Sequence, residues 1–265
     1  MKRPDQFSSA TSRKPAPRLK GIVVALPARN EQELIAQSLM SVQAAVKNLS
    51  TSLATVTSLA CDSCTDDTVT IANRFELDDE RFLVQEGRWR SVGQARRAAV
   101  AFGIERLLAE GVSLEEMWIA TTDADTTVGP TWLVEQVRFA NDGVDAIAGT
   151  VRLLSNADLT PETEECFGEM YHIAPHDHSH VHGANLGVRA SAYLAAGGFP
   201  PLATSEDRTL WTRLLNAGYR CHASTTLSVA TSARLHGRVD EGFAYALRNW
   251  QPARHNNLEL SRAAT

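Results

Sequence analysis

MWIATTDADT, residues Met117–Thr126, places two aspartates directly after an apolar run. The run predicts a buried β-strand, and Asp123 and Asp125 follow it at spacing i, i+2. In an open α/β sheet, ligands bind at the carboxyl ends of the strands. Hard cations such as Mg²⁺ take oxygen ligands, and one or two carboxylates suffice when a substrate phosphate supplies others. The stretch therefore indicates a divalent cation and a phosphate-bearing substrate, with a turn capped by carboxylates as the alternative.

Strands alternate with helices on both sides of this stretch. The predicted strands are 21–26, 53–60, 81–85, 117–122 and 145–153, and the predicted helices are 33–49, 67–75, 91–109 and 130–140. Asn30 is expected to cap the first helix. The alternation predicts an α/β fold: a mostly parallel mixed sheet with a Rossmann-like N-terminal half and helices on both faces.

The pattern loosens after Leu154. A polar loop with one helical stretch at 162–171 comes first, and helices at 190–196 and 205–217 and a strand at 227–230 follow. We expect a disordered leader over residues 1–19, a single domain over 20–250 and a flexible tail over 251–265.

Composition excludes several classes of protein. The chain is 43% hydrophobic and 22% charged, as is ordinary for a globular protein, and its net charge of -5 gives no support for nucleic-acid binding. The sequence shows neither an apolar run of membrane-spanning length nor a signal-peptide pattern. Together with four cysteines, this predicts a reduced, cytoplasmic protein. Cys61 and Cys64 form a Cys-x-x-Cys pair, for which a redox couple or half a zinc site is the less favoured interpretation.

Four polar clusters lie at candidate strand ends or helix starts. They are Pro27–Glu31, Asp62–Asp66, Asp123–Asp125 and Ser205–Asp207. The first three each follow a strand, so a parallel sheet would bring them to one edge.

With these motifs the sequence resembles family 2 glycosyltransferases of the nucleotide-diphospho-sugar transferase (GT-A) fold, from Ile22 to Trp250. Residues 23–31 resemble the family's first strand and its P-x-x-N-E turn, residues 61–68 its D-D-x-S-x-D-x-T loop, and Asp123–Asp125 its metal-binding D-x-D. Residues 183–189, 197–199 and 205–219 resemble the acceptor-side block that contains the E-D helix. The resemblance implies a nucleotide-binding half at 20–127 and an acceptor half at 128–250.

The family roles carry over residue by residue. The resemblance implies that Asp207 is the general base, that Glu206 orients it or the acceptor, and that Asp125 binds Mg²⁺ or Mn²⁺. Asp123 would contact the ribose or a metal-bound water, and a late histidine, His236 in preference to His182, would be a further metal ligand. The expected contacts with the nucleotide sugar come from Pro27, Ala28, Asn30, Glu31, Asp62, Gly93, Arg97, Asp123, Ala124, Gly183 and Ala184.

Three features depart from the family pattern. Cys61 stands where the family often has an acid, and Arg97 where it often has an asparagine. Arg88, Arg96 and Arg97 are either ligands for diphosphate or an anionic acceptor, or solvated helix charges. The third departure is a histidine cluster at positions 172, 176, 178, 180 and 182, for which a transition-metal site and a flexible acceptor loop are both open.

The sequence therefore predicts a metal-dependent glycosyltransferase that moves a sugar from a UDP- or GDP-linked donor to a hydroxyl acceptor, with inversion. A retaining enzyme of the same fold, a non-catalytic sugar-nucleotide binder and a histidine-rich metal-binding protein are the alternatives. A nucleotidyltransferase is a further alternative, although Pro27–Glu31 lacks the glycines of a typical phosphate loop.

Overall fold

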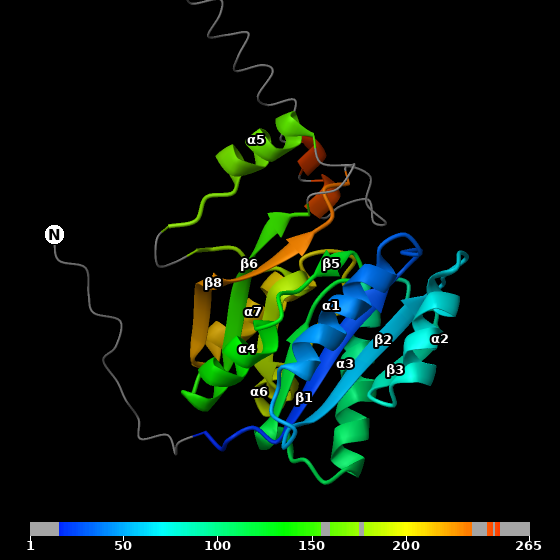
Figure 1. Cartoon of the computed structure of the whole chain (residues 1–265). Coiled ribbons are helices and arrows are strands. Elements are labelled where there is room, and N and C mark those ends of the chain that lie inside the picture. The colour runs from blue at the N-terminus through cyan, green and yellow to red at the C-terminus, as the bar shows by residue number, and fades with distance from the viewer. Residues whose placement is uncertain (1–15, 155–159, 175–177, 235–242, 246, 250–265) are drawn as a thin grey trace, which may run out of the picture.

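The computed structural model describes residues 16–154, 160–174, 178–234, 243–245 and 247–249 (Figure 1). The predicted tail and most of the predicted leader lie outside these residues, as do His176 and His236.

The described chain is built around one eight-stranded sheet of order β3-β2-β1-β4-β7-β6-β8-β5. The N-terminal half pairs four strands in parallel: β1 (Gly21–Ala28), β2 (Ala54–Asp62), β3 (Phe82–Gly87) and β4 (Met117–Thr121). All eight residues of β1 are buried. Such a continuous buried run is expected for a central parallel strand that is covered on both faces.

The C-terminal half extends the sheet with mixed pairing. Its strands are β5 (Thr126–Thr127), β6 (Ala146–Leu153), β7 (Leu186–Arg189) and β8 (Cys221–Thr231). β7 runs antiparallel to β4 and β6, β5 runs antiparallel to β8, and β6 and β8 are parallel. The predicted fold class, a mostly parallel mixed sheet, is confirmed.

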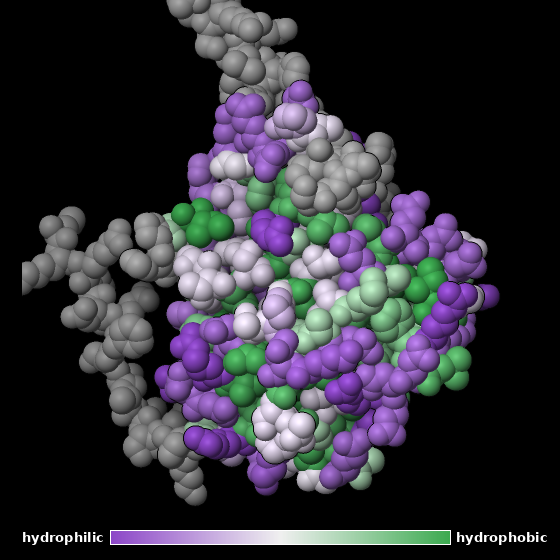
Figure 2. All heavy atoms as spheres, in the orientation of Figure 1, coloured by the Kyte–Doolittle hydropathy of each residue, from purple (hydrophilic) through white to green (hydrophobic). Residues whose placement is uncertain are grey.

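Helices cover both faces of the sheet (Figure 1). On one face α1 (Ile35–Lys47), α2 (Thr68–Asp78) and α4 (Trp132–Asn141) contribute to the same core as Ile22, Val24 and Leu26. On the other face α3 (Val92–Ala109), α6 (Ala190–Ala195) and α7 (Glu206–Asn216) contribute to the core that contains Val23 and Ala25. Alternate residues of β1 thus enter two separate cores. On the solvent-facing side of α1 and α4, hydrophilic side chains cover much of the surface (Figure 2).

Smaller elements complete the described chain. They are the 3₁₀ helices η1 (Leu114–Glu116) and η2 (Gly183–Asn185) and the helix α5 (Pro161–Met170), which lies beyond the ends of β6 and β8 (Figure 1). The side chain of Thr160 caps α5 by accepting a hydrogen bond from the Thr163 N–H. Among the described helices, none is both long and apolar enough to cross a membrane.

The predicted elements match the observed ones to within a few residues, with three differences. β8 begins at Cys221, six residues earlier than predicted, and the short strands β5 and β7 were not predicted. Asn30 does not cap α1, whose N-cap is Leu34. Instead, Asn30 adopts a left-handed conformation with φ 53°, and its side-chain oxygen accepts a hydrogen bond from the Thr65 N–H at 2.8 Å.

Candidate active site

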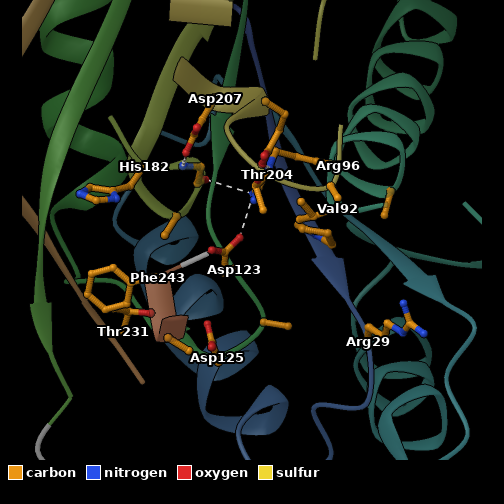
Figure 3. Close-up of a pocket in the computed structure, with 18 of the residues that line it drawn as sticks. Arg29, Val92, Arg96, Asp123, Asp125, His182, Thr204, Asp207, Thr231 and Phe243 are labelled. Atoms are coloured by element: carbon orange, nitrogen blue, oxygen red, sulfur yellow. Dashed lines mark hydrogen bonds and ion pairs between the residues drawn. The ribbon is translucent and has the colours of Figure 1, made fainter. Parts of the chain in front are cut away.

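A cavity of about 600 Å³ opens at the carboxyl edge of the sheet (Figure 3). The ends of β1 and β2, the loop after β4 and the first turn of α7 all contribute to its lining. Most of the predicted site residues line it: Pro27, Ala28, Glu31, Asp62, Asp123, Ala124, Asp125, Gly183, Ala184, Glu206 and Asp207. The expectation that strand-end clusters would meet at one edge is therefore confirmed.

The loops after β1 and β2 are tied to each other. Besides the bond from Asn30 to Thr65, the backbone N–H of Glu31 donates to Thr68 Oγ1 at 2.7 Å. Asp62, at the end of β2, is buried, and its Oδ1 accepts a hydrogen bond from the Trp89 N–H at 2.8 Å. These contacts fix the wall of the cavity where the resemblance expects the nucleotide.

Asp123 is bound by a buried arginine. Nη1 of Arg96 lies 2.8 Å from Asp123 Oδ1 and 3.1 Å from the Gly183 carbonyl oxygen, and its Nε lies 3.2 Å from Glu206 Oε1. The Arg96 residue is only 2% exposed. Burial opposes its charge, but Asp123 and Glu206 outweigh this effect and raise the pKa of the guanidinium. Arg96 is thus not a solvated helix charge, because it is an internal link between α3, the loop after β4 and α7.

Asp125 is bound by a second arginine, Arg234, which follows β8. Arg234 Nη2 lies 2.8 Å from Asp125 Oδ2, and the same guanidinium makes a two-pronged contact with the Glu31 carboxylate at 2.6 and 2.7 Å. Burial raises the pKa of Asp125 to about 6, although Arg234 works in the opposite direction. The side chain of Asp125 stays 15% exposed, so ligands in the cavity can reach it.

Asp207 lies in the first turn of α7 and extends into the cavity opposite Asp123 (Figure 3). Its Oδ2 accepts a hydrogen bond from the Gly183 N–H at 2.7 Å, and its Oδ1 accepts one from the Arg208 N–H at 2.6 Å. Burial raises the pKa of both Asp207 and Glu206. A Cβ at residue 183 would lie 2.5 Å from Arg96 Nη2, so any residue larger than glycine would displace this buried guanidinium.

An aromatic wall, made of Tyr171, His180, His182 and Phe243, lines the cavity beside Asp207. His180 stacks on Tyr171 with ring centroids 3.9 Å apart. The Tyr171 hydroxyl accepts a hydrogen bond from the Val151 N–H and lies 3.0 Å from His182 Nε2. Which of these two groups donates depends on the tautomer of His182. Burial lowers the pKa of His182 to about 3, so its ring is neutral.

The described histidines do not form a metal site. Within the described residues, no group of three or more histidine, cysteine, aspartate or glutamate side chains has a geometry that could hold a metal. His178 Nε2 and His180 Nε2 contact the carbonyl oxygens of Ser224 and His172. The preferred late ligand, His236, lies outside the described residues.

Three predicted nucleotide contacts lie outside the cavity lining. Asn30 joins two loops, as described above. Gly93 packs against the backbone carbonyls of Pro200 and Leu202, so closely that a Cβ would overlap the Pro200 oxygen. Arg97 is exposed and points toward the carbonyls of Gly197 and Phe199 at 3.4 and 3.5 Å. Their positions lend no support to a direct contact with the nucleotide.

The residue that sequence reasoning missed is Arg234. The sequence offered one indication of Arg234, which is that it lies shortly after the last strand, in Thr231–Arg234. That segment was used only to select His236 as a metal ligand. Its partners Glu31 and Asp125 are more than one hundred residues away, and only the fold brings the three together.

The donor set at the cavity fits a hard divalent cation. Six carboxylates line the cavity, those of Glu31, Asp62, Asp123, Asp125, Glu206 and Asp207, and two guanidinium groups, of Arg96 and Arg234, contact four of them. The remaining arginines of the lining, Arg29, Arg90 and Arg208, are exposed. Mg²⁺ and Mn²⁺ prefer oxygen ligands, and one or two carboxylates suffice where phosphate oxygens complete the set.

Comparison with solved structures supports the fold. A mannosyltransferase, PcManGT from Pyrobaculum calidifontis, solved with GDP-Man and Mn²⁺, is 18% identical with a TM-score of 0.57, over 84% of this chain and 59% of that one. TarS 1-349 from S. aureus, solved with UDP, is 15% identical with a TM-score of 0.58, over 81% of this chain and 61% of that one. The chain thus spans about three-fifths of these proteins. A search of curated protein sequences gave no match.

The sequence itself matches a family profile. The profile described as Glycosyl transferase family 2 matches residues 23–193, well over half of the chain. This range contains the loops after β1 and β2 and the D-x-D. The predicted resemblance and the predicted enzyme class, glycosyltransferase, are confirmed, and the chain belongs to glycosyl transferase family 2.

Proposed function

We propose that the protein transfers a sugar from a nucleoside diphosphate sugar to a hydroxyl group of an acceptor. One observation carries this proposal: the aspartates of the D-x-D and the acid of the α7 turn line the same cavity. A transferase needs these two sets of carboxylates together, because one set serves the departing diphosphate and the other serves the attacking hydroxyl.

The donor belongs on the side of the cavity formed by the ends of β1 and β2. Pro27, Ala28, Glu31 and Asp62 line this wall, and the two linked loops hold its shape. A UDP- or GDP-linked sugar is the proposed donor, in keeping with the nucleotides present in the two related structures.

Asp125 is the proposed ligand for Mg²⁺ or Mn²⁺, with Asp123 close to it. The cation, when bound, would supply Lewis-acid stabilisation of the charge on the leaving diphosphate. Asp123 is held in place by Arg96, so its orientation toward the donor is fixed before binding. His236 keeps its predicted role as a further ligand, and it lies outside the described residues.

Asp207 is the proposed general base. A raised pKa makes a carboxylate a better proton acceptor, and burial supplies this effect here. Its two backbone hydrogen bonds hold it in the cavity, where it would remove the proton of the acceptor hydroxyl as that oxygen attacks the anomeric carbon. Direct attack of this kind inverts the anomeric centre. Glu206 contacts Arg96 and acts as a positioning residue.

We further propose a cytoplasmic location and an acceptor in free solution. The low cysteine content of the chain, four in 265 residues, supports this location, because proteins of a reducing compartment do not depend on disulfides.

Calorimetric titration with UDP and with GDP, each with and without Mn²⁺, tests the proposal. We expect one of the two nucleotides to bind, and to bind more tightly when Mn²⁺ is present. If neither binds in the presence of Mn²⁺, the proposed donor site is wrong.

A further inference from the structure

The contacts of Arg234 join two acids that have different proposed tasks. Its guanidinium holds the Glu31 carboxylate with two hydrogen bonds and reaches Asp125 with one N–H group. Planar, two-pronged pairing with a carboxylate is the geometry that fixes an arginine most firmly. Glu31 is therefore the anchor of Arg234, and Asp125 is its second, more weakly held partner.

Arg234 competes with a cation for Asp125. The guanidinium nitrogen occupies a position 2.8 Å from Asp125 Oδ2, within the space where a ligand of that oxygen would lie. A divalent cation on Asp125 would meet a positive charge at close range, and two like charges a few ångströms apart in a partly buried site repel strongly. Arg234 therefore has to give up its contact with Asp125 before a metal can bind there.

Arg96 provides the contrast within the same cavity. It is 2% exposed and is surrounded by Asp123, Glu206 and the carbonyls of Thr122 and Gly183. The side chain of Arg234 is 21% exposed and lines the cavity directly. Arg96 is thus a fixed internal link, whereas Arg234 can change partners while Glu31 holds it.

We propose that Arg234 is an exchangeable counter-ion that couples metal binding to donor binding. Without donor, it neutralises Asp125 and disfavours the metal. When a nucleoside diphosphate is present, the diphosphate replaces Asp125 as its partner, since a guanidinium pairs well with phosphate oxygens, and Asp125 is released to the metal. This inference rests on the proposed donor and metal sites.

Binding of Mn²⁺ alone, followed by electron paramagnetic resonance of the free ion, tests the competition directly. In Arg234→Gln we expect Mn²⁺ to bind about tenfold more tightly than in the parent protein when no nucleotide is present, a change of about 1.4 kcal/mol. Arg106→Gln is the matched control, because Arg106 also pairs with a carboxylate, Glu110 at 2.7 Å, but at an exposed surface site. The control should bind Mn²⁺ as the parent does.

The coupling itself is the ratio of the Mn²⁺ dissociation constants without and with UDP or GDP. We expect this ratio to be about tenfold smaller in Arg234→Gln than in the parent, because coupling between two ligands is reciprocal and the residue that carries it is gone. Arg234→Lys keeps the positive charge that opposes the metal, so its Mn²⁺ affinity without nucleotide should stay close to that of the parent. Parent-like Mn²⁺ affinity in folded Arg234→Gln overturns the inference.

The two measurements, of Mn²⁺ binding alone and of the coupling ratio, distinguish a failure of this inference from a failure of the proposed function. If the parent binds no nucleotide but Arg234→Gln still binds Mn²⁺ more tightly, the donor proposal fails and the competition at Asp125 stands. If the parent binds nucleotide with Mn²⁺ and the ratio is the same in the variant, the donor proposal stands and the role of Arg234 is wrong.

Discussion

At the scale of single residues, we expect Asp125 to be required for tight binding of the nucleotide in the presence of metal. Asp125→Ala removes the proposed metal ligand while leaving a small side chain in a partly exposed loop, so the fold should survive. We expect the affinity for nucleotide in the presence of Mn²⁺ to fall about 100-fold, or about 2.8 kcal/mol, in calorimetric titration. Asp79→Ala, which breaks a remote pair with Arg81, is the control. Unchanged affinity in Asp125→Ala would remove the metal site.

Asp207 should matter for transfer and not for donor binding. Asp207→Asn keeps the shape of the side chain, and its amide oxygen can still accept the hydrogen bond from the Gly183 N–H. It cannot take a proton from the acceptor. We expect nucleotide affinity within about twofold of the parent and a turnover rate lower by about 10²–10⁴-fold, the usual contribution of a general base. A fully active variant would show that another group removes the proton.

At the scale of elements, Arg96 links α3 to α7 and to the loop after β4. Removing one partner of a buried charge network leaves the other charges uncompensated, which costs about 3–5 kcal/mol. Arg96→Met should lower the free energy of unfolding by this amount in urea titration, while Arg106→Met on the surface should change it by less than about 1 kcal/mol. The double variant Arg96→Met/Glu206→Gln should recover part of the loss, since Glu206 then needs no counter-charge. Equal midpoints for the two single variants would contradict this role.

The elements that sequence could predict are those with a local signal. β1, β4, α3 and α4 carry strong apolar patterns or capping residues, and each lies where it was expected. β7 (Leu186–Arg189) escaped prediction because its four residues follow the 3₁₀ turn η2 directly and are buried between β4 and β6, which only tertiary pairing reveals. Asn30 was expected to be a helix cap, yet its side chain bonds to a loop 35 residues away. No local pattern reports such a contact.

In the site, too, residues that lie in a local sequence motif were predictable, and residues placed only by tertiary contacts were not. Asp123, Asp125 and Asp207 each sit in a recognisable motif, and the cavity contains all three. The arginines that hold them were not predictable in this role. Arg96 is one of two adjacent arginines on α3, and only the packing decides that Arg96 points inward and Arg97 outward. The charge network of the cavity is therefore a property of the tertiary structure.

At the scale of the whole molecule, His182 should make stability depend on pH. Burial holds its folded-state pKa at about 3, against about 6.5 in an unfolded chain. Between these values the unfolded chain binds a proton that the folded protein does not, so stability is fully present above about pH 6.5 and is lost as the pH falls toward 3.

The effect can be isolated by difference, because the carboxylates and the other histidines titrate alike in both proteins. Going from pH 7 to pH 5, the parent should lose about 1–2 kcal/mol more unfolding free energy than His182→Gln, which has no proton to bind. Urea titrations at the two pH values measure this difference. The variant will be less stable than the parent at pH 7 if it loses the hydrogen bond with Tyr171, but that offset is independent of pH. Equal losses in both proteins would mean that His182 binds its proton in the folded state, and that the aromatic wall opens readily to water.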